Sequence, residues 1–384
     1  MSNNKLLTIG MATYDDFDGV FFSIQALRMY HKDVIDDIEL IIIDNNPGKP
    51  HSESIKNFTN QIKNHVSIRH ILADDWKSTA VRDRIFTEAN TPYVLSMDSH
   101  VLIDPGALKK LIKYYKDNPD TNNLLQGPML YDCLTAAVTH MDPVWRDHMY
   151  GTWGVDDRGK DVNGEPFEIP MHGMGLFTCR KEAWLGFNRK FKGFGGEEGY
   201  IHDKYRKAGH KTLCLPFLRW NHRFERPNGV KYRLDLTDRV WNYFVGFIEN
   251  GKDVKPVVDH FNNHLNPETV KGILENVKHF MDTGEDRTAP KNPPTVEAVE
   301  PEVSGNTVVQ KTGNNIKTIE EVDNATGETI HRSEGTLCFG ELVPGKQIGT
   351  VYVDGNALPV YADGCKPDCV KLYPHDHIYE RVIQ

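Results

Sequence analysis

Short apolar runs alternate with segments of helical spacing over about the first 115 residues. Ile38–Asp44 (IELIIID) is an almost continuous apolar run rich in β-branched residues, which is typical of a strand buried on both faces. Phe21–His31 repeats apolar residues at intervals of three and four, which predicts an amphipathic helix. This alternation predicts an α/β fold with a mostly parallel sheet. The other predicted strands are Leu6–Ala12, Val66–Leu72 and Tyr93–Met97, and the other predicted helices are Ser52–Asn64, Thr79–Ala89 and Pro105–Lys116.

Polar clusters follow three of the predicted strands: Thr13-Tyr14-Asp15, Asp44-Asn45-Asn46 and Asp98-Ser99-His100. Ligands of parallel α/β sheets bind beyond the carboxyl ends of the strands. We therefore expect the three clusters to lie at one common edge of the sheet.

The pattern changes after about residue 125. Residues 126–226 are rich in Gly, Trp, His and Met and lack clean periodicity, which is typical of long functional loops, although Thr212–Leu218 is a predicted strand. Helices are predicted at Leu234–Ile248 and Pro267–Met281. The predicted division is a domain of residues 1–282, a Pro- and Glu-rich linker at 283–304, and a small β-rich domain at 305–384.

Composition narrows the class of protein. The 384 residues are 39% hydrophobic and 26% charged, a globular mixture that excludes collagen-like, disordered and disulfide-dense chains. The net charge of -9 argues against a broad face for nucleic-acid backbones. Six sparse cysteines indicate reduced thiols and a cytoplasmic location. The N-terminus lacks a secretory pattern and no apolar run approaches about 18 residues, so we expect neither a signal peptide nor membrane insertion.

Asp98 and His100 are alternate residues at a strand end, so they project to the same side. Mixed oxygen and nitrogen ligands suit Mn²⁺ or a similar cation better than Ca²⁺. A single Asp-x-His pair is more often a capped turn, and a single histidine is more often structural. His222, in the segment Trp220-Asn221-His222, is a candidate third ligand that makes a metal site credible.

Glu197 and Glu198 follow the glycine-rich sequence Gly193-Phe194-Gly195-Gly196. Glycines permit close approach of a ligand to the backbone, and paired carboxylates can bind sugar hydroxyls or act as a base. The alternative is a glycine turn before a helix whose first turn favours acidic residues.

Cysteines and histidines near the C-terminus form a second candidate metal site. The residues are Cys338, Cys365, Cys369, His375 and His377. A zinc site is one interpretation, although the Cys-x₃-Cys spacing differs from the usual zinc knuckle, and ordinary loop residues are the other.

In its first 250 or so residues the chain resembles glycosyltransferases of the A-type fold, close to family 2 and to polypeptide N-acetylgalactosaminyltransferases. Asp98-Ser99-His100 matches the Asp-x-His variant of the family's metal motif, and the segment of His222 matches the histidine that completes the site. Met171–Arg180 (MHGMGLFTCR) resembles the loop and strand that contact the donor sugar. Phe194–Glu197 matches the aromatic-Gly-Gly-Glu element, which normally carries Trp.

The resemblance implies a site. Asp98, His100 and His222 would hold Mn²⁺ (or Mg²⁺), and Glu197 and Glu198 would be catalytic. Its nucleotide-sugar contacts would be Thr13, Tyr14, Asp44 (toward uracil), Arg82, Asp98, Gly175, Gly196, Arg226 and Tyr232.

The implied reaction moves a hexosyl or N-acetylhexosaminyl group from a UDP-sugar to a hydroxyl of a protein Ser/Thr, a glycan or a modified DNA base. The donor sugar and the stereochemistry stay open. The C-terminal domain would bind the acceptor or mediate oligomerisation. A nucleotidyltransferase of similar fold is an alternative, but residues 12–16 are acidic and poor in glycine. A non-catalytic nucleotide-sugar-binding protein is another, but the intact Asp98, His100, Glu197 and His222 argue against it.

Overall fold

The computed structural model describes residues 5–131, 137–224 and 229–288 in full, and the backbone of five strands between residues 307 and 361. The chain divides into two units, residues 1–225 with 230–289 and residues 226–229 with 290–384. Every described residue of the candidate site belongs to the first unit.

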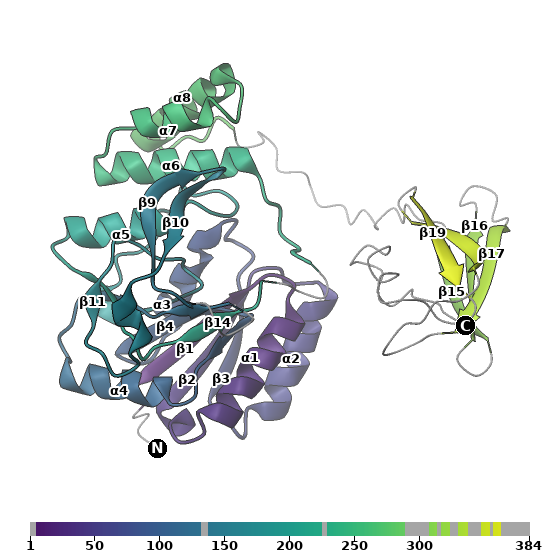
Figure 1. Ribbon diagram of the computed structural model, residues 1–384, viewed down its shortest axis with the longest axis horizontal. Helices are drawn as coiled ribbons and strands as arrows, with labels where there is room; N and C mark the ends of the chain where they lie inside the picture. The colour runs from purple at the N-terminus through teal and green to yellow at the C-terminus, as the bar shows by residue number, and fades with distance from the viewer. Residues whose placement is uncertain are drawn as a thin grey trace. The chain divides into compact units, whose positions relative to one another are not determined.

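An eight-stranded sheet lies at the centre of the first unit, in the order β11-β13-β6-β12-β4-β1-β2-β3 (Figure 1). Strands β3, β2, β1 and β4 are parallel neighbours, whereas β12 runs antiparallel between β4 and β6. The predicted α/β fold with a mostly parallel sheet is therefore confirmed. Its strands are β1 (Leu7–Thr13), β2 (Ile38–Asp44), β3 (Ile68–Leu72), β4 (Tyr93–Asp98), β6 (Leu124–Gln126), β11 (Phe167–Glu168), β12 (Leu176–Arg180) and β13 (Thr212–Cys214).

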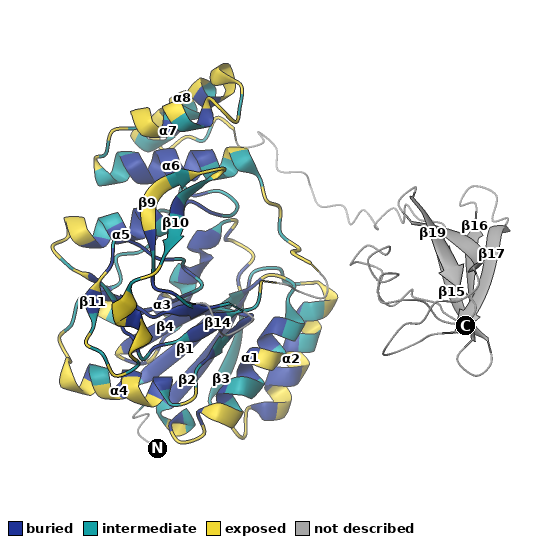
Figure 2. Ribbon diagram, viewed as in Figure 1, coloured by how far each residue is buried: buried dark blue, intermediate teal, exposed yellow. Residues whose placement is uncertain are grey.

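Helices cover both faces of this sheet, so its central strands β1, β2 and β4 are buried, whereas the edge strand β3 is only partly buried (Figure 2). Leu7, Ile9 and Met11 pack into a core with α1, α2 and α4, whereas Ile41 and Ile43 belong to a second core with α3, α5, α6, α7 and α8. The almost continuous apolar pattern of β2 follows from this double coverage. The helices are α1 (Phe17–Tyr30), α2 (Pro50–Ile62), α3 (Asp83–Glu88), α4 (Ala107–Asp117), α5 (Glu197–Lys207), α6 (Leu236–Asn250), α7 (Lys255–Phe261) and α8 (Pro267–Thr283), with short 3₁₀ turns at Ile35–Asp37, Thr79–Arg82, Asp157–Lys160 and Lys181–Ala183.

A second, four-stranded sheet has the order β5-β14-β7-β8. Its strands are β5 (Val101–Ile103), β7 (Met129–Leu130), β8 (Ala137–Val138) and β14 (Trp220–His222), and a separate hairpin pairs β9 (His140–Arg146) with β10 (Met149–Gly154). Residues 126–226 thus contain far more regular structure than predicted. Most of these strands are only two or three residues long, too short to show a period of two.

Three further predictions differ from the structure. Thr79–Ala89 is not one helix, because a 3₁₀ turn at Thr79–Arg82 precedes α3. The strand predicted at Thr212–Leu218 ends at Cys214, and His222 lies in a strand of its own. Helix α7 was not predicted. It has seven residues, fewer than periodicity needs to identify a helix.

The second unit is described only by the backbone of its strands. β15 (Thr307–Thr312), β16 (Ile316–Val322) and β17 (Thr329–Thr336) form one antiparallel sheet, and β18 (Gln347–Val353) pairs with β19 (Asn356–Tyr361). The predicted zinc ligands lie outside the described residues, as does most of the predicted linker, and the domain boundaries stay predictions. No helix among the described residues has both the length and the apolar character to cross a membrane.

Candidate active site

The polar clusters lie at one edge of the central sheet, as expected. In the parallel register Thr13 of β1 pairs with Asp44 of β2, and Ala12 pairs with Asp98 of β4. Three strand ends therefore carry their polar residues to the same place.

Asp98, His100 and His222 form a compact group in which one ligand atom of each lies within 4.8 Å of the others. Asp98 Oδ2 is 3.8 Å from His100 Nε2 and 3.6 Å from His222 Nε2. In the part of the chain that the structure describes, no other three His, Cys, Asp or Glu side chains converge in this way. One carboxylate oxygen and two imidazole nitrogens are a donor set that fits Mn²⁺ or a similar cation.

Strand pairing brings His222 to this group. Strand β5 directly follows the Asp98-Ser99-His100 turn and pairs antiparallel with β14, which places His222 opposite Val101. The N–H of Arg223 also donates to the carbonyl of His100 at 3.2 Å. The position of His222, the candidate third ligand, therefore depends on a contact between distant segments.

Helix α1 holds the turn from the other side. Ser23 Oγ lies 2.7 Å from the carbonyl of Ser99 and 2.9 Å from that of Val101. Asp16 Oδ2 accepts a hydrogen bond from Ser99 Oγ at 2.7 Å and lies 3.3 Å from His100 Nδ1. Burial opposes the charge of Asp16, but His100 and Ser99 lower its pKa well below the usual range.

A buried arginine connects the two halves of the site. Arg82 donates from Nη2 to Asp98 Oδ1 at 3.0 Å and from Nη1 to Glu197 Oε1 at 2.9 Å. Burial alone would raise the pKa of Asp98, but Arg82 and the two histidines lower it far below its usual range. The pKa of Arg82 is raised by its two carboxylate partners against the opposing effect of burial. Asp98 therefore stays ionised, as a metal ligand must.

Glu197 begins α5 directly after Gly195 and Gly196, whose φ angles of 96° and 91° favour glycine. It is 1% exposed, and its Oε2 has no hydrogen-bond partner among the described residues. Burial and the neighbouring Glu197 raise the pKa of Glu198 to about 7. Of the two glutamates, only Glu197 is connected to Asp98, because Arg82 donates hydrogen bonds to both carboxylates.

Asn242 of α6 holds the glycine-rich loop at residues 193–196 in place. Its side chain accepts from the N–H of Lys192 at 2.7 Å and donates to the carbonyls of Lys192 and Gly195 at 2.7 and 2.8 Å. Because Asn242 is fully buried, these bonds are not exchanged with water. The loop therefore has a defined backbone before any ligand arrives.

The loop before β12 also approaches the metal group. The carbonyl of Gly175 accepts from the N–H of Asp98 at 2.8 Å, and a Cβ at Gly175 would lie 3.1 Å from the His222 ring. Gln126 supports the loop from behind, donating to the carbonyls of Gly173 and Leu176 at 2.8 and 3.2 Å. Gly175 thus permits close packing of this loop on the site.

Three aromatic rings line up beside the strand ends. Tyr232 lies edge-on to Tyr14, with 6.1 Å between ring centroids, and 4.8 Å from the ring of Phe194. Tyr14 is 36% exposed, whereas Thr13 is buried and its hydroxyl has no partner among the described residues. The predicted Tyr14 and Tyr232 are therefore neighbours, and Arg226 lies outside the described residues.

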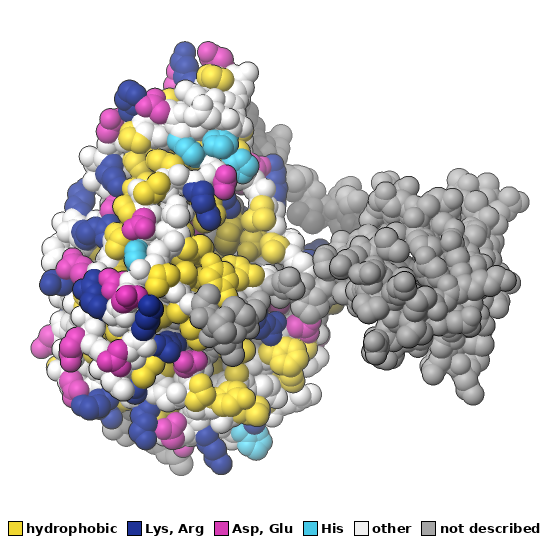
Figure 3. Space-filling model, in the orientation of Figure 1, with side chains coloured by type: hydrophobic (Ala, Val, Ile, Leu, Met, Phe, Trp, Pro, Cys, Tyr) yellow, Lys and Arg dark blue, Asp and Glu magenta, His cyan; other side chains and the backbone are white. Residues whose placement is uncertain are grey.

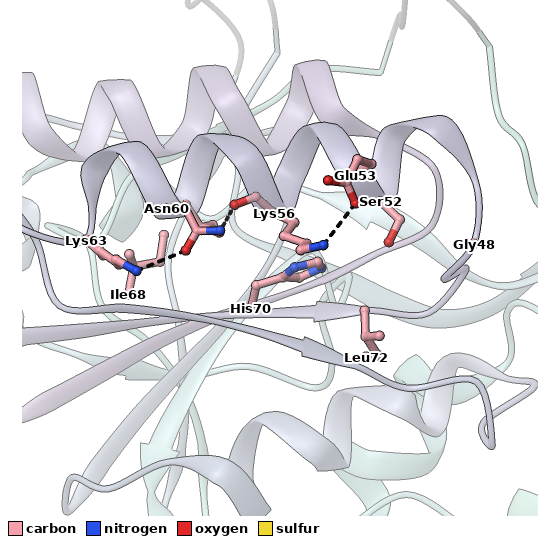
Figure 4. A pocket seen from close by; sticks show the side chains of 10 residues that line it. Gly48, Ser52, Glu53, Lys56, Asn60, Lys63, Ile68, His70 and Leu72 are labelled. Carbon is pink, nitrogen blue, oxygen red and sulfur yellow. Dashed lines mark hydrogen bonds and ion pairs between the residues drawn. The ribbon is translucent and has the colours of Figure 1, made fainter.

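Asp44 is buried and its carboxylate is already engaged. Its Oδ2 lies 3.1 Å from His70 Nε2, and its Oδ1 accepts from the N–H of Asn46 at 3.1 Å. His70 faces a cavity of about 480 Å³ between α2 and β3, which Lys56 and Lys63 also line (Figure 4). This cavity includes none of the three metal-ligand candidates.

Sequence reasoning did not identify several residues that build the site, namely Asp16, Ser23, Gln126 and Asn242. Asp16 had one local signal, since an Asp three residues before a glycine at a helix start is typical of an N-cap. The roles of Gln126 and Asn242 depend on long-range contacts and leave no local pattern.

The sheet order, the Asp-x-His turn after β4 and the glycine loop before α5 define a class, the nucleotide-sugar glycosyltransferases of the A-type fold. The family model described as glycosyl transferase family 2 matches residues 8–180. Residues 8–180 therefore resemble family 2 glycosyltransferases, and the resemblance drawn from the motifs is confirmed. No curated protein sequence matches the chain.

Two solved structures illustrate the likeness. GalNAc-T7, solved with UDP, GalNAc and Mn²⁺, has a TM-score of 0.51 and 13% identity, over 94% of this chain and 72% of that one. The mannosyltransferase PcManGT from Pyrobaculum calidifontis, in complex with GDP-Man and Mn²⁺, has a TM-score of 0.43 and 13% identity, over 74% of this chain and 77% of that one. At this identity the first match supports the fold alone.

Proposed function

We propose that the chain transfers a hexosyl or N-acetylhexosaminyl group from a UDP-sugar to an acceptor hydroxyl, with a divalent cation held by Asp98, His100 and His222. The convergence of these three side chains at the carboxyl end of β4 carries the proposal. Mn²⁺ or Mg²⁺ would act there as a Lewis acid toward the leaving diphosphate. The Mn²⁺ and UDP in the GalNAc-T7 structure support this choice of cation and donor.

The chain's own residues would orient the donor. Thr13 and Asp44 end the strands where a nucleotide would bind, Tyr14 directly follows Thr13, and Tyr232 lies beside Tyr14. The loops of Gly175 and Gly196 would contact the sugar. The partnerless Oε2 of buried Glu197 is suited to accept a sugar hydroxyl. Arg82 would hold Glu197 and Asp98 in fixed relation and face the diphosphate side of the site.

Glu198 is the candidate for proton transfer. A general base works best when its pKa lies near the working pH, and the pKa of Glu198 is raised to about 7. It would take the acceptor proton in an inverting reaction, whereas a retaining reaction needs no such base on the opposite face. Anomeric analysis of the product distinguishes the two.

The acceptor is a hydroxyl of a protein, a glycan or a modified DNA base. On the face in Figure 3, Lys and Arg side chains of the first unit are interspersed with Asp and Glu, which disfavours a nucleic-acid backbone. Cys179 and Cys214 are buried free thiols, which supports the cytoplasmic location that the sparse cysteines predict.

A donor screen with metal control tests the proposal. Wild-type chain should release UDP from one of a panel of UDP-sugars in Mn²⁺, and EDTA should abolish the release. Asp98→Ala and His100→Ala should lose at least about 100-fold in rate, the typical effect of removing electrostatic stabilisation of a leaving group. Asp157→Ala, an exposed carboxylate, is the matched control. Undiminished turnover in EDTA would contradict the metal-dependent reaction.

A further inference from the structure

Asp16 occupies the junction between the metal group and helix α1. Its Oδ1 accepts from the N–H of Gly19 at 3.0 Å and so caps the helix, while its Oδ2 faces Ser99 Oγ at 2.7 Å and His100 Nδ1 at 3.3 Å. The same carboxylate therefore contacts a helix start and the back of a candidate metal ligand.

Gly19 is required for this arrangement. A Cβ at Gly19 would lie 2.2 Å from Asp16 Oδ2, far inside van der Waals contact, so any other residue there would displace the carboxylate. Gly19 has no left-handed φ that would explain it otherwise. The close approach of the Asp16 carboxylate is therefore the structural reason for a glycine at this position.

The chemistry of the contact determines which histidine nitrogen is protonated. A carboxylate only accepts hydrogen bonds, so His100 must donate from Nδ1–H, and in a neutral imidazole Nε2 then carries the lone pair. Nε2 is the nitrogen that faces Asp98 Oδ2 at 3.8 Å. Histidines that bind metals commonly donate their other N–H to a carboxylate in this way, which orients the ring and increases its basicity.

We propose that Asp16 is a positioning residue of the metal site, which fixes the Nδ1–H tautomer of His100 and ties the site to the start of α1. This inference rests on the proposed function, because it needs the group to bind a cation. A merely structural role, as the cap of α1, is the competing explanation.

Asp16→Asn separates the two roles. Asn caps helices as well as Asp does, so α1 should stay capped. The amide, however, presents N–H groups toward His100 Nδ1. This favours the opposite tautomer, in which Nε2 carries the proton and has no lone pair to offer a cation. Asn266→Asp exchanges the same two residue types at the N-cap of α8 and is the matched control.

The measurement is the Mn²⁺ dissociation constant of the full chain, from the electron paramagnetic resonance signal of free Mn²⁺, with and without UDP. Asp16→Asn should weaken binding about 10- to 100-fold, the usual effect of losing such a supporting carboxylate, while Asn266→Asp leaves it unchanged. Gly19→Ala, which favours the helix but displaces Asp16, should weaken binding in the same direction. If both Asp16→Asn and Gly19→Ala left the Mn²⁺ affinity unchanged, this inference would be overturned, whereas the proposed function would not be affected.

A metal-free readout separates this inference from the proposed function. In ¹⁵N spectra of histidine-labelled chain without metal, recorded at a pH at which the ring of His100 is neutral, His100 should show the Nδ1–H tautomer, and Asp16→Asn should shift it toward Nε2–H. The Nε2–H tautomer in wild-type chain would overturn the inference. Failure of wild-type chain to bind Mn²⁺ in either condition would instead contradict the proposed metal site, and with it the role of Asp16 in that site.

Discussion

Neighbouring carboxylates of the site differ in protonation because their surroundings differ. Asp98 lies beside Arg82 and two histidines, and its pKa is lowered although burial opposes the charge. Glu198 is partly buried and lies next to another carboxylate, so burial and Glu197 raise its pKa to about 7. One glutamate is therefore suited to exchange a proton near neutral pH, while the aspartate stays a permanent anion.

The raised pKa of Glu198 predicts a pH-dependent stability. As pH rises from about 4.5 to 7, the unfolded chain releases this proton before the folded chain does, so the folded state loses stability, by at most about 3 kcal/mol. Glu198→Gln cannot ionise and therefore does not lose this stability. The melting temperature of Glu198→Gln relative to that of wild type should rise as the pH increases from 5 to 8. Parallel melting curves across this range would contradict the prediction. Glu182→Gln, at an exposed glutamate, should match wild type throughout.

At the scale of elements, local patterns predicted the strands of the parallel half well, because buried strands such as β2 are apolar at most of their positions. They failed where elements are short or where two kinds of helix meet. The predicted helix at Thr79–Ala89 instead begins as a 3₁₀ turn at Thr79–Arg82 that leads directly into α3. The pattern of apolar residues does not distinguish these two kinds of helix, because both bury residues three positions apart.

Close packing of β1 on α3 predicts a sharp effect at Gly10. A Cβ there would lie 2.0 Å from Ile85 Cγ2, so Gly10→Ala must push apart the strand and the helix and should cost about 1–3 kcal/mol. Gly272→Ala in α8 has nothing within 4 Å of the added Cβ and should instead stabilise the chain by about 0.5–1 kcal/mol. Urea unfolding of both variants checks the pair, and equal effects would refute the packing argument.

At the scale of the whole molecule, the two large apolar cores of the described residues lie between Leu7 and Val277. Helices α6, α7 and α8, which stack at one end of the first unit, complete the second core (Figure 1). The first unit therefore contains what an independently folding domain needs.

A chain of residues 1–288 is accordingly expected to fold alone. It should unfold in one cooperative transition and gain thermal stability from UDP with Mn²⁺, because a ligand that binds only the folded state stabilises it by mass action. Differential scanning calorimetry of this fragment beside the full chain provides the measurement. A fragment that lacks a cooperative transition would show that later residues are needed for the fold.

The sequence by itself determined the α/β class, the parallel strands and the Asp98-Ser99-His100 turn. A buried strand and the motif that follows it consist of adjacent residues, so both can be recognised from a short segment of sequence. The sequence also identified His222 and Glu197 as candidates, but could not place them. Only the tertiary structure brought His222 to Asp98, through the pairing of β14 with β5, and connected Glu197 to Asp98 through Arg82. The contact between Asp16 and His100 Nδ1 was likewise revealed only by the tertiary structure. Contacts between distant segments depend on strand pairing and helix packing, which leave no period in the sequence.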